Sequence, residues 1–306
     1  MADQPPTQTP QIESAPPARR SETLQLLRIG GSRMQRMLAA ERKGELDMHG
    51  LFQARRGREL VGAAWGQVTP GRTASCWPAG LVPGEPEDTA IHLQAAVDNY
   101  LDREHVAIVQ AVLPVRAATD AMRLVRAGYH HLADLDYLIC HSGRFPCEKP
   151  SSDLDFEPFS PSDDSRLGKL VERTYVDSFD CVGLDGMRPI ADVLAGYRET
   201  GRYRPDWWLF VRHLGQDVGC ILLADHPEHD QCELMYLGMI PEVRGRGWGE
   251  QATRHAQWLI GISRERMILA VDDNNWPAQG VYSATDFDLW DRRCVYVRSA
   301  HGVLSR

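Results

Sequence analysis

The apolar positions in the second half of the chain alternate between the spacing of strands and the spacing of helices. Around Gly215, two apolar runs flank a short polar turn, which predicts a hairpin. Farther on, Ala252, Ala256 and Ile260 recur at helical spacing and predict an amphipathic helix. The predicted strands cover residues 207–212, 218–224, 233–240, 267–271 and 294–298, and the predicted helices cover residues 250–262 and 277–284. This order predicts an α/β fold, with a mixed, mostly antiparallel sheet flanked by helices.

The first half of the chain repeats part of this pattern. Leu51-Phe52 precedes a glycine turn as Leu209-Phe210 does, and the two pairs lie 158 residues apart (209 − 51). Tyr129 and Phe287 have the same separation (287 − 129). Two matches at one separation favour a duplicated domain, so we expect two tandem domains of one fold. A chance match is the alternative, because glycine turns between strands are common.

Two segments have the composition of linkers. Residues 1–20 are rich in Pro, Gln, Thr and Ala and carry few large apolar side chains, which predicts a disordered tail. Residues 143–165 are dense in Pro, Ser and Asp, which favour turns. A chain of 306 residues also exceeds the usual size of one core. We therefore predict domains at residues 21–145 and 146–306.

The charge and the cysteine content argue against several classes of protein. A formal charge of −8 is unlike that of a nucleic-acid-binding protein, which needs a basic surface to neutralise phosphates. The sequence has no apolar run long enough to span a membrane, and its N-terminus lacks the apolar core of a secretory signal. The 7 cysteines include no Cys-x-x-Cys pair, which suits a reducing cytoplasm better than a disulfide framework or a zinc site. We expect a cytoplasmic protein without a metal, nucleic acid or membrane partner.

A glycine-rich segment between the third predicted strand and the next helix is the strongest candidate for a binding site. It reads Arg-Gly-Arg-Gly-Trp-Gly at residues 244–249. Glycine lets backbone N–H groups approach a ligand without a Cβ, and the positive end of a helix dipole attracts anions. Together they predict a site for a phosphate or pyrophosphate. The spacing differs from that of the Walker P-loop and of the dinucleotide fingerprint.

This segment resembles the Arg/Gln-x-x-Gly-x-Gly/Ala motif of the GNAT superfamily of N-acetyltransferases. Arg244, Gly247 and Gly249 fill its three fixed positions. The resemblance spans residues 156–298 and implies a domain that uses acetyl-CoA as co-substrate. The residues that it assigns to cofactor binding are Leu237, Gly238, Met239, Arg244, Gly245, Arg246, Gly247, Trp248, Gly249, Glu250 and Asn275.

A second block resembles the Asn-x-x-Ala-x-x-x-Tyr sequence of the same family. It runs from Asn275 to Tyr282 and closes on Phe287, with Asp286 in place of the usual glycine. In the family, the Asn contacts the pantetheine region or the following turn, and the Tyr hydroxyl can protonate the leaving thiolate. The resemblance therefore implies that Tyr282 is a catalytic acid. The alternative is a core aromatic residue on a helix.

The resemblance also implies the other steps of amine acylation. An amine would attack the thioester carbonyl of acetyl-CoA directly, and the N–H of Met239 would polarise that carbonyl. Glu233 resembles the general base of the histone acetyltransferase branch, acting directly or through water. The alternative for Glu233 is a solvated carboxylate at the end of a strand. The acceptor would be a small-molecule or peptide amine.

Other polar clusters keep two interpretations each. Residues 272–275 and 226–230 contain residue types that bind metals, but a capped turn and a polar hairpin tip are the simpler interpretations. Asp177, Asp180 and Asp185 lie where the family often places loops that contact the substrate. They would attract an amine there, or they are solvated loop carboxylates.

Shifting the motif back by 158 residues tests whether the first domain is also a candidate for CoA binding. The loop then falls on residues 86–91, which contain two carboxylates and no glycine. The counterparts of Glu233, Asn275 and Tyr282 are Ser75, Ala117 and Leu124. We expect a degenerate GNAT-like first domain that does not bind CoA in the standard way, in a tandem resembling mycothiol synthase-like proteins. The alternatives are a non-catalytic acyl-CoA-binding module and an aminoacyl or peptidyl transferase of doubled GNAT-like fold, which generally lacks this loop.

Overall fold

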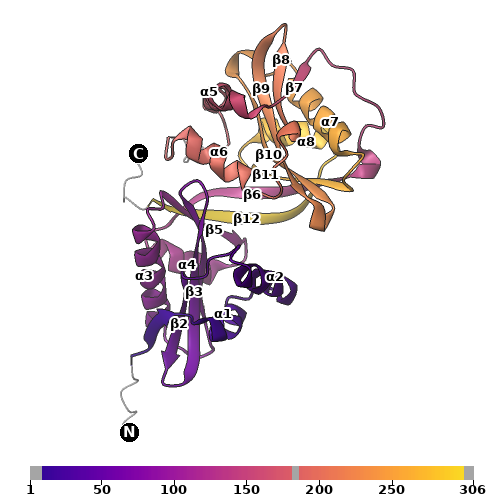
Figure 1. The fold of residues 1–306 in the computed structure, drawn as a ribbon. Helices are drawn as coiled ribbons and strands as arrows, with labels where there is room; N and C mark the ends of the chain where they lie inside the picture. Colours follow the sequence, from indigo (N-terminus) through magenta and orange to yellow (C-terminus); the bar gives the residue numbers. More distant parts are fainter. Residues whose placement is uncertain (1–8, 181–185, 300–306) are drawn as a thin grey trace. The chain divides into compact units, whose positions relative to one another are not determined.

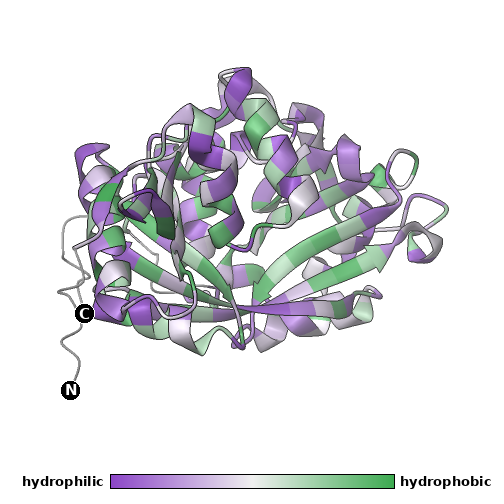
Figure 2. Ribbon diagram, turned by 90° about the horizontal axis from the view of Figure 1, so that it is seen from below, coloured by the Kyte–Doolittle hydropathy of each residue, from purple (hydrophilic) through white to green (hydrophobic). Residues whose placement is uncertain are grey.

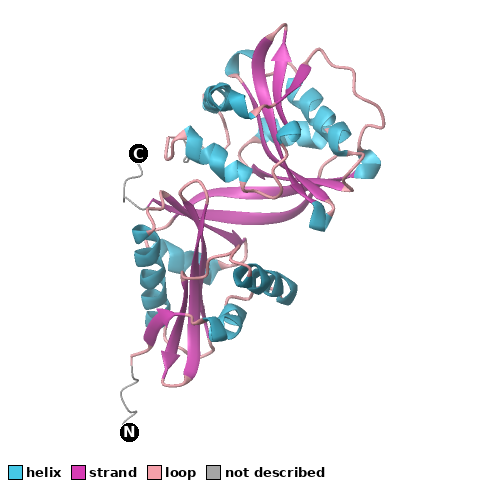
Figure 3. Ribbon diagram, viewed as in Figure 1, coloured by secondary structure: helices cyan, strands magenta, loops and turns pink. Residues whose placement is uncertain are grey.

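The computed structural model describes residues 9–180 and 186–299 (Figure 1). They form two compact units, one made of the chain up to His131 and from Val295 onward, and the other of Leu132–Cys294. In each unit, helices flank the strands of a sheet (Figure 3). Apolar residues concentrate on the strands, whereas the helices alternate between apolar and polar positions, as expected when one face packs on the sheet (Figure 2). None of the described helices is long and apolar enough to cross a membrane.

The strands that lie wholly in the first unit follow the order β1-β2-β3-β4-β5. The pairs are antiparallel as far as β4, and β4 and β5 run parallel. The long helix α3 buries Leu93, Val97 and Leu101 in the core of this unit. Its elements are β1 (Gln11–Ser14), α1 (Arg20–Leu26), α2 (Gly31–Arg42), β2 (Leu51–Arg56), β3 (Glu59–Thr69), β4 (Thr73–Leu81), α3 (Glu87–Arg103), β5 (Ile108–Pro114) and α4 (Ala118–Arg126).

The strands of the second unit follow the order β6-β11-β10-β9-β8-β7. Only β10 and β11 run parallel among these described pairs. Trp208 and Phe210 are fully buried in its core. The elements are β6 (His130–His141), β7 (Asp155–Pro158), α5 (Asp164–Tyr175), α6 (Ile190–Arg198), β8 (Trp208–His213), β9 (Gln216–His226), β10 (Gln231–Met239), α7 (Trp248–Ile260), β11 (Arg266–Asp272), α8 (Trp276–Ala284) and β12 (Asp288–Ser299).

The strands and helices predicted for the second half of the chain are present, with shifts of a few residues at their ends. The largest shift is in the last strand, which begins at Asp288 and not at Cys294. The charged residues between 288 and 293 interrupt the hydropathy pattern, so the pattern does not indicate the first half of this strand. Arg292 is paired with Asp136, and Arg293 is paired with Asp291, so these charged side chains are satisfied within a strand.

The order of elements confirms that the chain contains the same scaffold twice. In the parallel pairs, Thr73 faces Ile108 and Gln231 faces Arg266, and both positions are displaced by 158 residues (231 − 73 and 266 − 108). Each repeat continues with a helix and a final strand, α4 and β6 in the first and α8 and β12 in the second. The connection between β10 and α7 is three residues longer than its counterpart between β4 and α3.

Two expectations about order along the chain are wrong. Residues 11–14 of the predicted tail form β1, which pairs with β2, and Ala15 is buried. Backbone hydrogen bonds to β2 supply the order that the side chains of this segment do not. Residues 1–8 lie outside the described part of the chain. The predicted linker is also packed, because Leu154 and Phe159 are buried in the core of the second unit.

The boundary between the two units lies after His131, earlier than the predicted division near residue 145. The reason is the pairing of β6, which runs antiparallel to β11 from Leu135 to His141. This strand ends the first repeat in sequence but belongs to the second unit by its hydrogen bonds. Correspondingly, the last residues of β12, from Val295, belong to the first unit.

Candidate active site

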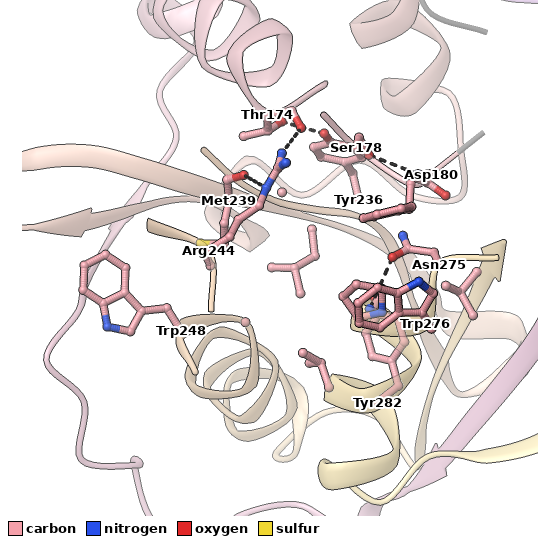
Figure 4. Close-up of a pocket in the computed structure, with 18 of the residues that line it drawn as sticks. Thr174, Ser178, Asp180, Tyr236, Met239, Arg244, Trp248, Asn275, Trp276 and Tyr282 are labelled. Carbon is pink, nitrogen blue, oxygen red and sulfur yellow. Dashed lines mark hydrogen bonds between the residues drawn. The ribbon is translucent and has the colours of Figure 1, made fainter. Parts of the chain in front are cut away.

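The second unit contains a cavity of about 610 Å³ at the carboxyl end of β10. Its wall comes from the end of β10, the glycine-rich loop with the start of α7, the start of α8, and the segment that follows α5 (Figure 4). The residues that line it are Thr174, Asp177, Ser178, Phe179, Asp180, Leu234, Met235, Tyr236, Leu237, Gly238, Met239, Val243, Arg244, Gly245, Gly247, Trp248, Gly249, Ala270, Val271, Asn275, Trp276, Pro277, Ala278, Val281 and Tyr282. The fold thus brings both sequence blocks to one cavity.

The end of β10 turns one edge of its backbone toward the cavity. The register with β11 covers Gln231–Glu233, after which the two strands diverge around a bulge at Met235. Ile240 N–H donates to the carbonyl of Val218 on β9, at 3.0 Å. Neighbouring residues of an antiparallel strand direct their N–H groups to opposite edges. The N–H of Met239 therefore points away from β9, toward the opening left by β11.

The glycine-rich loop leaves a run of backbone donors without acceptors. Gly245 has φ 79° and Gly247 has φ 75°, a left-handed conformation that glycine adopts without strain. Within the described residues, the N–H groups from Gly245 to Glu250 have no backbone acceptor, and the first bond of α7 runs from Gln251 to Gly247. These donors, at the positive end of the dipole of α7, fit an anionic phosphate group.

Arg244 contacts backbone carbonyls. Its guanidinium donates to Asp177 O at 2.8 Å, Thr174 O at 2.9 Å and Met239 O at 3.1 Å (Figure 4). It therefore ties the end of β10 to the segment after α5 and holds two walls of the cavity together. Its guanidinium is held by these three carbonyls, and the phosphate contact that the motif implies for this residue stays a prediction.

Tyr282 and Asn275 reach the cavity from α8. Tyr282 is 7% exposed, and burial raises the pKa of its hydroxyl, with a further contribution from the nearby carboxylate of Asp180. The phenol therefore keeps its proton at neutral pH and acts as a hydrogen-bond donor. Asn275 begins the helix, and its Oδ1 accepts from Ala278 N–H at 3.3 Å. The cap fixes the orientation of α8 and leaves the amide NH₂ of Asn275 for a ligand.

Glu233 is close to the cavity but is not part of its lining. It is the last residue of β10 in register with β11, and its Oε2 lies 3.0 Å from Nε2 of His226. This hydrogen bond raises the pKa of His226. Glu233 faces Ala224 across the sheet and Tyr236 faces Leu222, so the bulge keeps Glu233 and Tyr236 on one face.

Three further predicted binding residues lie at the margin of the site. Trp248 lines the cavity, but its ring packs 4.7 Å from that of His213 and is directed away from Asn275 and Tyr282 (Figure 4). The guanidinium of Arg246 lies 5.3 Å from the ring of Trp248. The side chains of Arg246 and Glu250 are exposed, and neither residue is among those that line the cavity.

The comparisons with known proteins agree with this geometry. The model of the Acetyltransferase (GNAT) family matches residues 174–287. Over these residues the chain is similar to the GNAT family. No curated protein matches the sequence.

Solved structures resemble almost the whole chain and not only the GNAT domain. A GCN5-related N-acetyltransferase from Sphaerobacter thermophilus has a TM-score of 0.65 at 15% identity, over 95% of this chain and 96% of that one. A tandem GNAT protein from the clavulanic acid biosynthesis pathway has a TM-score of 0.58 at 12% identity, over 95% and 98%. At such identities the likeness establishes the fold, which is GNAT-like and tandem as predicted. The closer resemblance to mycothiol synthase-like proteins stays a prediction.

Sequence reasoning missed several residues of the GNAT domain cavity. Tyr236 is bonded through its hydroxyl to Oγ1 of Thr174 at 2.6 Å, which ties β10 to α5. Phe179 and Trp276 face each other across the cavity mouth, with ring centres 5.7 Å apart. Trp276 directly follows Asn275 within the second motif block, so the sequence contains a signal for this residue. The position of Thr174 depends on the fold, and no local pattern marks it.

Two of the three polar clusters form structural contacts, and the third lies partly at the cavity. Asp272 Oδ1 accepts from Asn274 N–H at 2.9 Å, which forms the predicted turn before α8. His226 begins the turn at residues 227–229 and is paired with Glu233. Asp177 and Asp180 line the cavity, whereas Asp185 lies outside the described residues.

Proposed function

We propose that the GNAT domain transfers an acetyl group from acetyl-CoA to a primary amine, by direct attack of the amine on the thioester. The observation that carries this proposal is the cavity itself. Backbone donors of the loop at 245–250, the open edge of β10 and the buried hydroxyl of Tyr282 all face it. A phosphate, an amide-rich pantetheine arm and a thioester need these three groups in this order.

The loop and the strand would hold the co-substrate without charged side chains. The amides from Gly245 to Glu250 fit the pyrophosphate, and the edge of β10 fits the amides of pantetheine. Met239 N–H would then donate to the thioester carbonyl oxygen. Negative charge grows on this oxygen during the attack, so a fixed donor stabilises the transition state more than the ground state.

Two side chains would move protons. Tyr282 is protonated at neutral pH and would donate to the sulfur as the C–S bond breaks. Glu233 would accept a proton from the attacking ammonium, through water because it lies outside the cavity lining. Its hydrogen bond to His226 holds the carboxylate in place and offers the proton a path toward solvent.

We also propose that the chain has one active site and that the first unit does not bind CoA in the standard way. The first unit begins α3 with Glu87 and Asp88, where the second unit presents open amides. A doubly charged pyrophosphate would be repelled there. We further propose a cytoplasmic location, which suits the free thiols of the described cysteines.

The first test is a steady-state assay of CoA release with acetyl-CoA and a panel of amines. We expect amine-dependent release from the wild-type chain. We expect Tyr282→Phe to lower kcat about 10- to 100-fold, the range of one general acid, with the KM for acetyl-CoA within twofold. Tyr236→Phe is the matched control, because it removes a hydroxyl that is already bonded to Thr174.

Each negative result has its own meaning. Unchanged kcat in Tyr282→Phe would remove the catalytic acid from the proposal. Binding of acetyl-CoA without release for any amine would make the domain a non-catalytic acyl-CoA module.

A further inference from the structure

A hydrogen-bonded pair of side chains forms the cavity wall on the side of α5. The hydroxyl of Tyr236 on β10 and Oγ1 of Thr174 on α5 lie 2.6 Å apart, and both residues line the cavity. The Thr174 hydroxyl also donates to the carbonyl of Val171, at 2.7 Å. A carbonyl can only accept, so the single proton of the threonine is used there, and Tyr236 donates to Thr174. Both hydroxyl protons are thereby committed, which fixes the orientation of the tyrosine.

The ring of Tyr236 is held between two other tyrosine rings. Its centre lies 5.9 Å from that of Tyr175 on α5 and 6.0 Å from that of Tyr197 on α6. A Cβ placed on Gly238 would lie 2.6 Å from Oγ1 of Thr174 and 2.8 Å from the hydroxyl oxygen of Tyr236, so the pair lies directly against the backbone of β10. A side chain packed on several sides resists displacement, because a shift strains its neighbours. The wall is therefore rigid.

This wall and Tyr282 lie on opposite sides of the cavity (Figure 4). In the second unit, α5 and α6 cover one face of the sheet, and α7 and α8 cover the other (Figure 1). Tyr236 is bonded to α5, whereas Tyr282 is part of α8. A group bound in the cavity thus has the Tyr236 ring on one side and the phenol of α8 on the other.

The proposed position of the thioester directs its acyl chain toward the Tyr236 ring. A thioester carbon carries the oxygen, the sulfur and the acyl chain in one plane, and the three point apart like the corners of a triangle. The oxygen would accept from the N–H of Met239, which lies in the plane of the sheet. The sulfur would lie near Tyr282, on the side of α8. The third corner, which the acyl chain occupies, then faces α5 and the ring of Tyr236.

We propose that the ring of Tyr236, held by Thr174, is a specificity-determining group that limits the acyl chain to acetyl and excludes longer chains. This inference rests on the proposed function. Each methylene group beyond acetyl must displace a side chain that is already packed on its other sides. The bond changes are the same for every chain. The amine nitrogen bonds to the acyl carbon as the C–S bond breaks, the ammonium proton leaves to the general base, and the thiolate takes a proton from the acid.

The experiment uses the full chain and three thioesters that differ only in the acyl chain: acetyl-CoA, propionyl-CoA and butyryl-CoA. The fastest amine of the panel is kept at one fixed concentration while CoA release is measured. We expect kcat/KM to fall about 3- to 10-fold from acetyl-CoA to propionyl-CoA and at least about 30-fold to butyryl-CoA, as for groups forced into a packed site. Calorimetric titration of acetyl-CoA and butyryl-CoA gives the same comparison without turnover.

Variants of the wall then locate the effect. Tyr236→Ala removes the ring and should raise kcat/KM for butyryl-CoA, relative to acetyl-CoA, at least about tenfold. Tyr236→Leu should act in the same direction and retains more of the packing, so it replaces the alanine variant if that variant does not fold. Tyr236→Phe keeps the ring and should keep a preference for acetyl-CoA of at least about tenfold. Tyr203→Ala is the matched control, because Tyr203 packs against the same core outside the described cavity lining.

The outcomes separate the two proposals. Equal use and equal binding of the three thioesters by the wild type would overturn the inference and leave the acyltransferase intact. A preference for acetyl-CoA that persists in Tyr236→Ala and Tyr236→Leu would also overturn it. Absence of CoA release with every thioester would overturn the proposed function. In that case, tighter binding of acetyl-CoA than of butyryl-CoA that is lost in Tyr236→Ala would still support the size limit, and equal binding would overturn it.

Discussion

The connection from β10 to α7 and the connection from β4 to α3 differ in how the positive end of the following helix is compensated. Both join a strand to the positive end of a helix. In the second unit, the first amides of α7 are left without a backbone acceptor. In the first unit, Glu87 and Asp88 occupy the first turn of α3, and Thr89 donates to the carboxylate of Glu85. The first unit thus supplies its own anions, and the second leaves the place for an external one.

The acidic residues of the first unit are held in position by cations of the same unit. Arg56 is paired with Glu85 at 2.8 Å and lowers its pKa, and Arg123 is paired with Glu87 at 2.6 Å and lowers its pKa. The cavity of the first unit, about 440 Å³, lies between α3 and α4. A duplicated scaffold can therefore lose an anion site by filling it with carboxylates, without changing the order of its elements.

The largest effect that we expect from this difference concerns two matched glycines. Gly247 has φ 75° and Gly84 has φ 85°, and an added Cβ would have no neighbour within 4 Å at either position. Gly247→Ala and Gly84→Ala should each destabilise the fold by about 1–2 kcal/mol through backbone strain. Only Gly247→Ala should raise the KM for acetyl-CoA, about 30- to 100-fold, because it reorients the amides that we propose to bind phosphate. A similar KM change in Gly84→Ala would contradict the division of roles.

An intermediate effect concerns the eighth residue of each helix. The rings of His255 on α7 and Phe156 are stacked with their centres 3.7 Å apart, and burial lowers the pKa of His255 to about 4, whereas the eighth residue of α3 is Gln94. The folded state holds His255 neutral, while the unfolded chain takes up a proton below pH 6.5. Stability is therefore lost as the pH falls from about 6.5 to about 4.

Urea unfolding measures this loss. Relative to the wild type, His255→Gln should gain about 2 kcal/mol at pH 5 compared with its effect at pH 8. The measurement at pH 8 is the control for the packing that the substitution changes. The same difference at both pH values would show that proton uptake by this side chain does not matter.

The smallest effect concerns one carboxylate at each helix start. Glu250 is exposed in the first turn of α7, and Asp88 is exposed in the first turn of α3. Glu250→Gln should lower the KM for acetyl-CoA about two- to threefold, because it removes a negative charge beside the phosphate site. Asp88→Asn should leave that KM unchanged. High salt should abolish the gain, and a gain that persists in high salt would rule out the electrostatic cause.

Much of the fold and of the candidate site could be predicted from the sequence. The strands and helices of the second half follow from local periodicity, and the repeat follows from one constant separation. The loop at 244–249 and Tyr282 follow from a family motif, and the structure brings them to one cavity. Apart from the repeat, which needs a comparison across 158 residues, these features are revealed by residues that are close together in the sequence.

The features that the sequence could not show involve partners that are distant in sequence. Arg244 is bonded to carbonyls of Thr174 and Asp177, and a motif cannot show that a guanidinium is already occupied. Residues 11–14 have the composition of a disordered tail, but their order comes from the pairing of β1 with β2. The base role of Glu233 depends on its distance from the cavity, and the sequence gives the strand but not the divergence of β10 from β11.

The placement of β6 has a consequence for the history of the chain. The boundaries of the sequence repeat differ from the boundaries of the compact units. The last strand of the first repeat, β6, pairs with β11 in the second unit. A gene fragment cut at the repeat boundary would encode β11 with an unsatisfied backbone edge, which tends to pair with other chains. The second repeat is thus inherited together with the first, and the first repeat can lose a ligand site of its own without being lost from the genome.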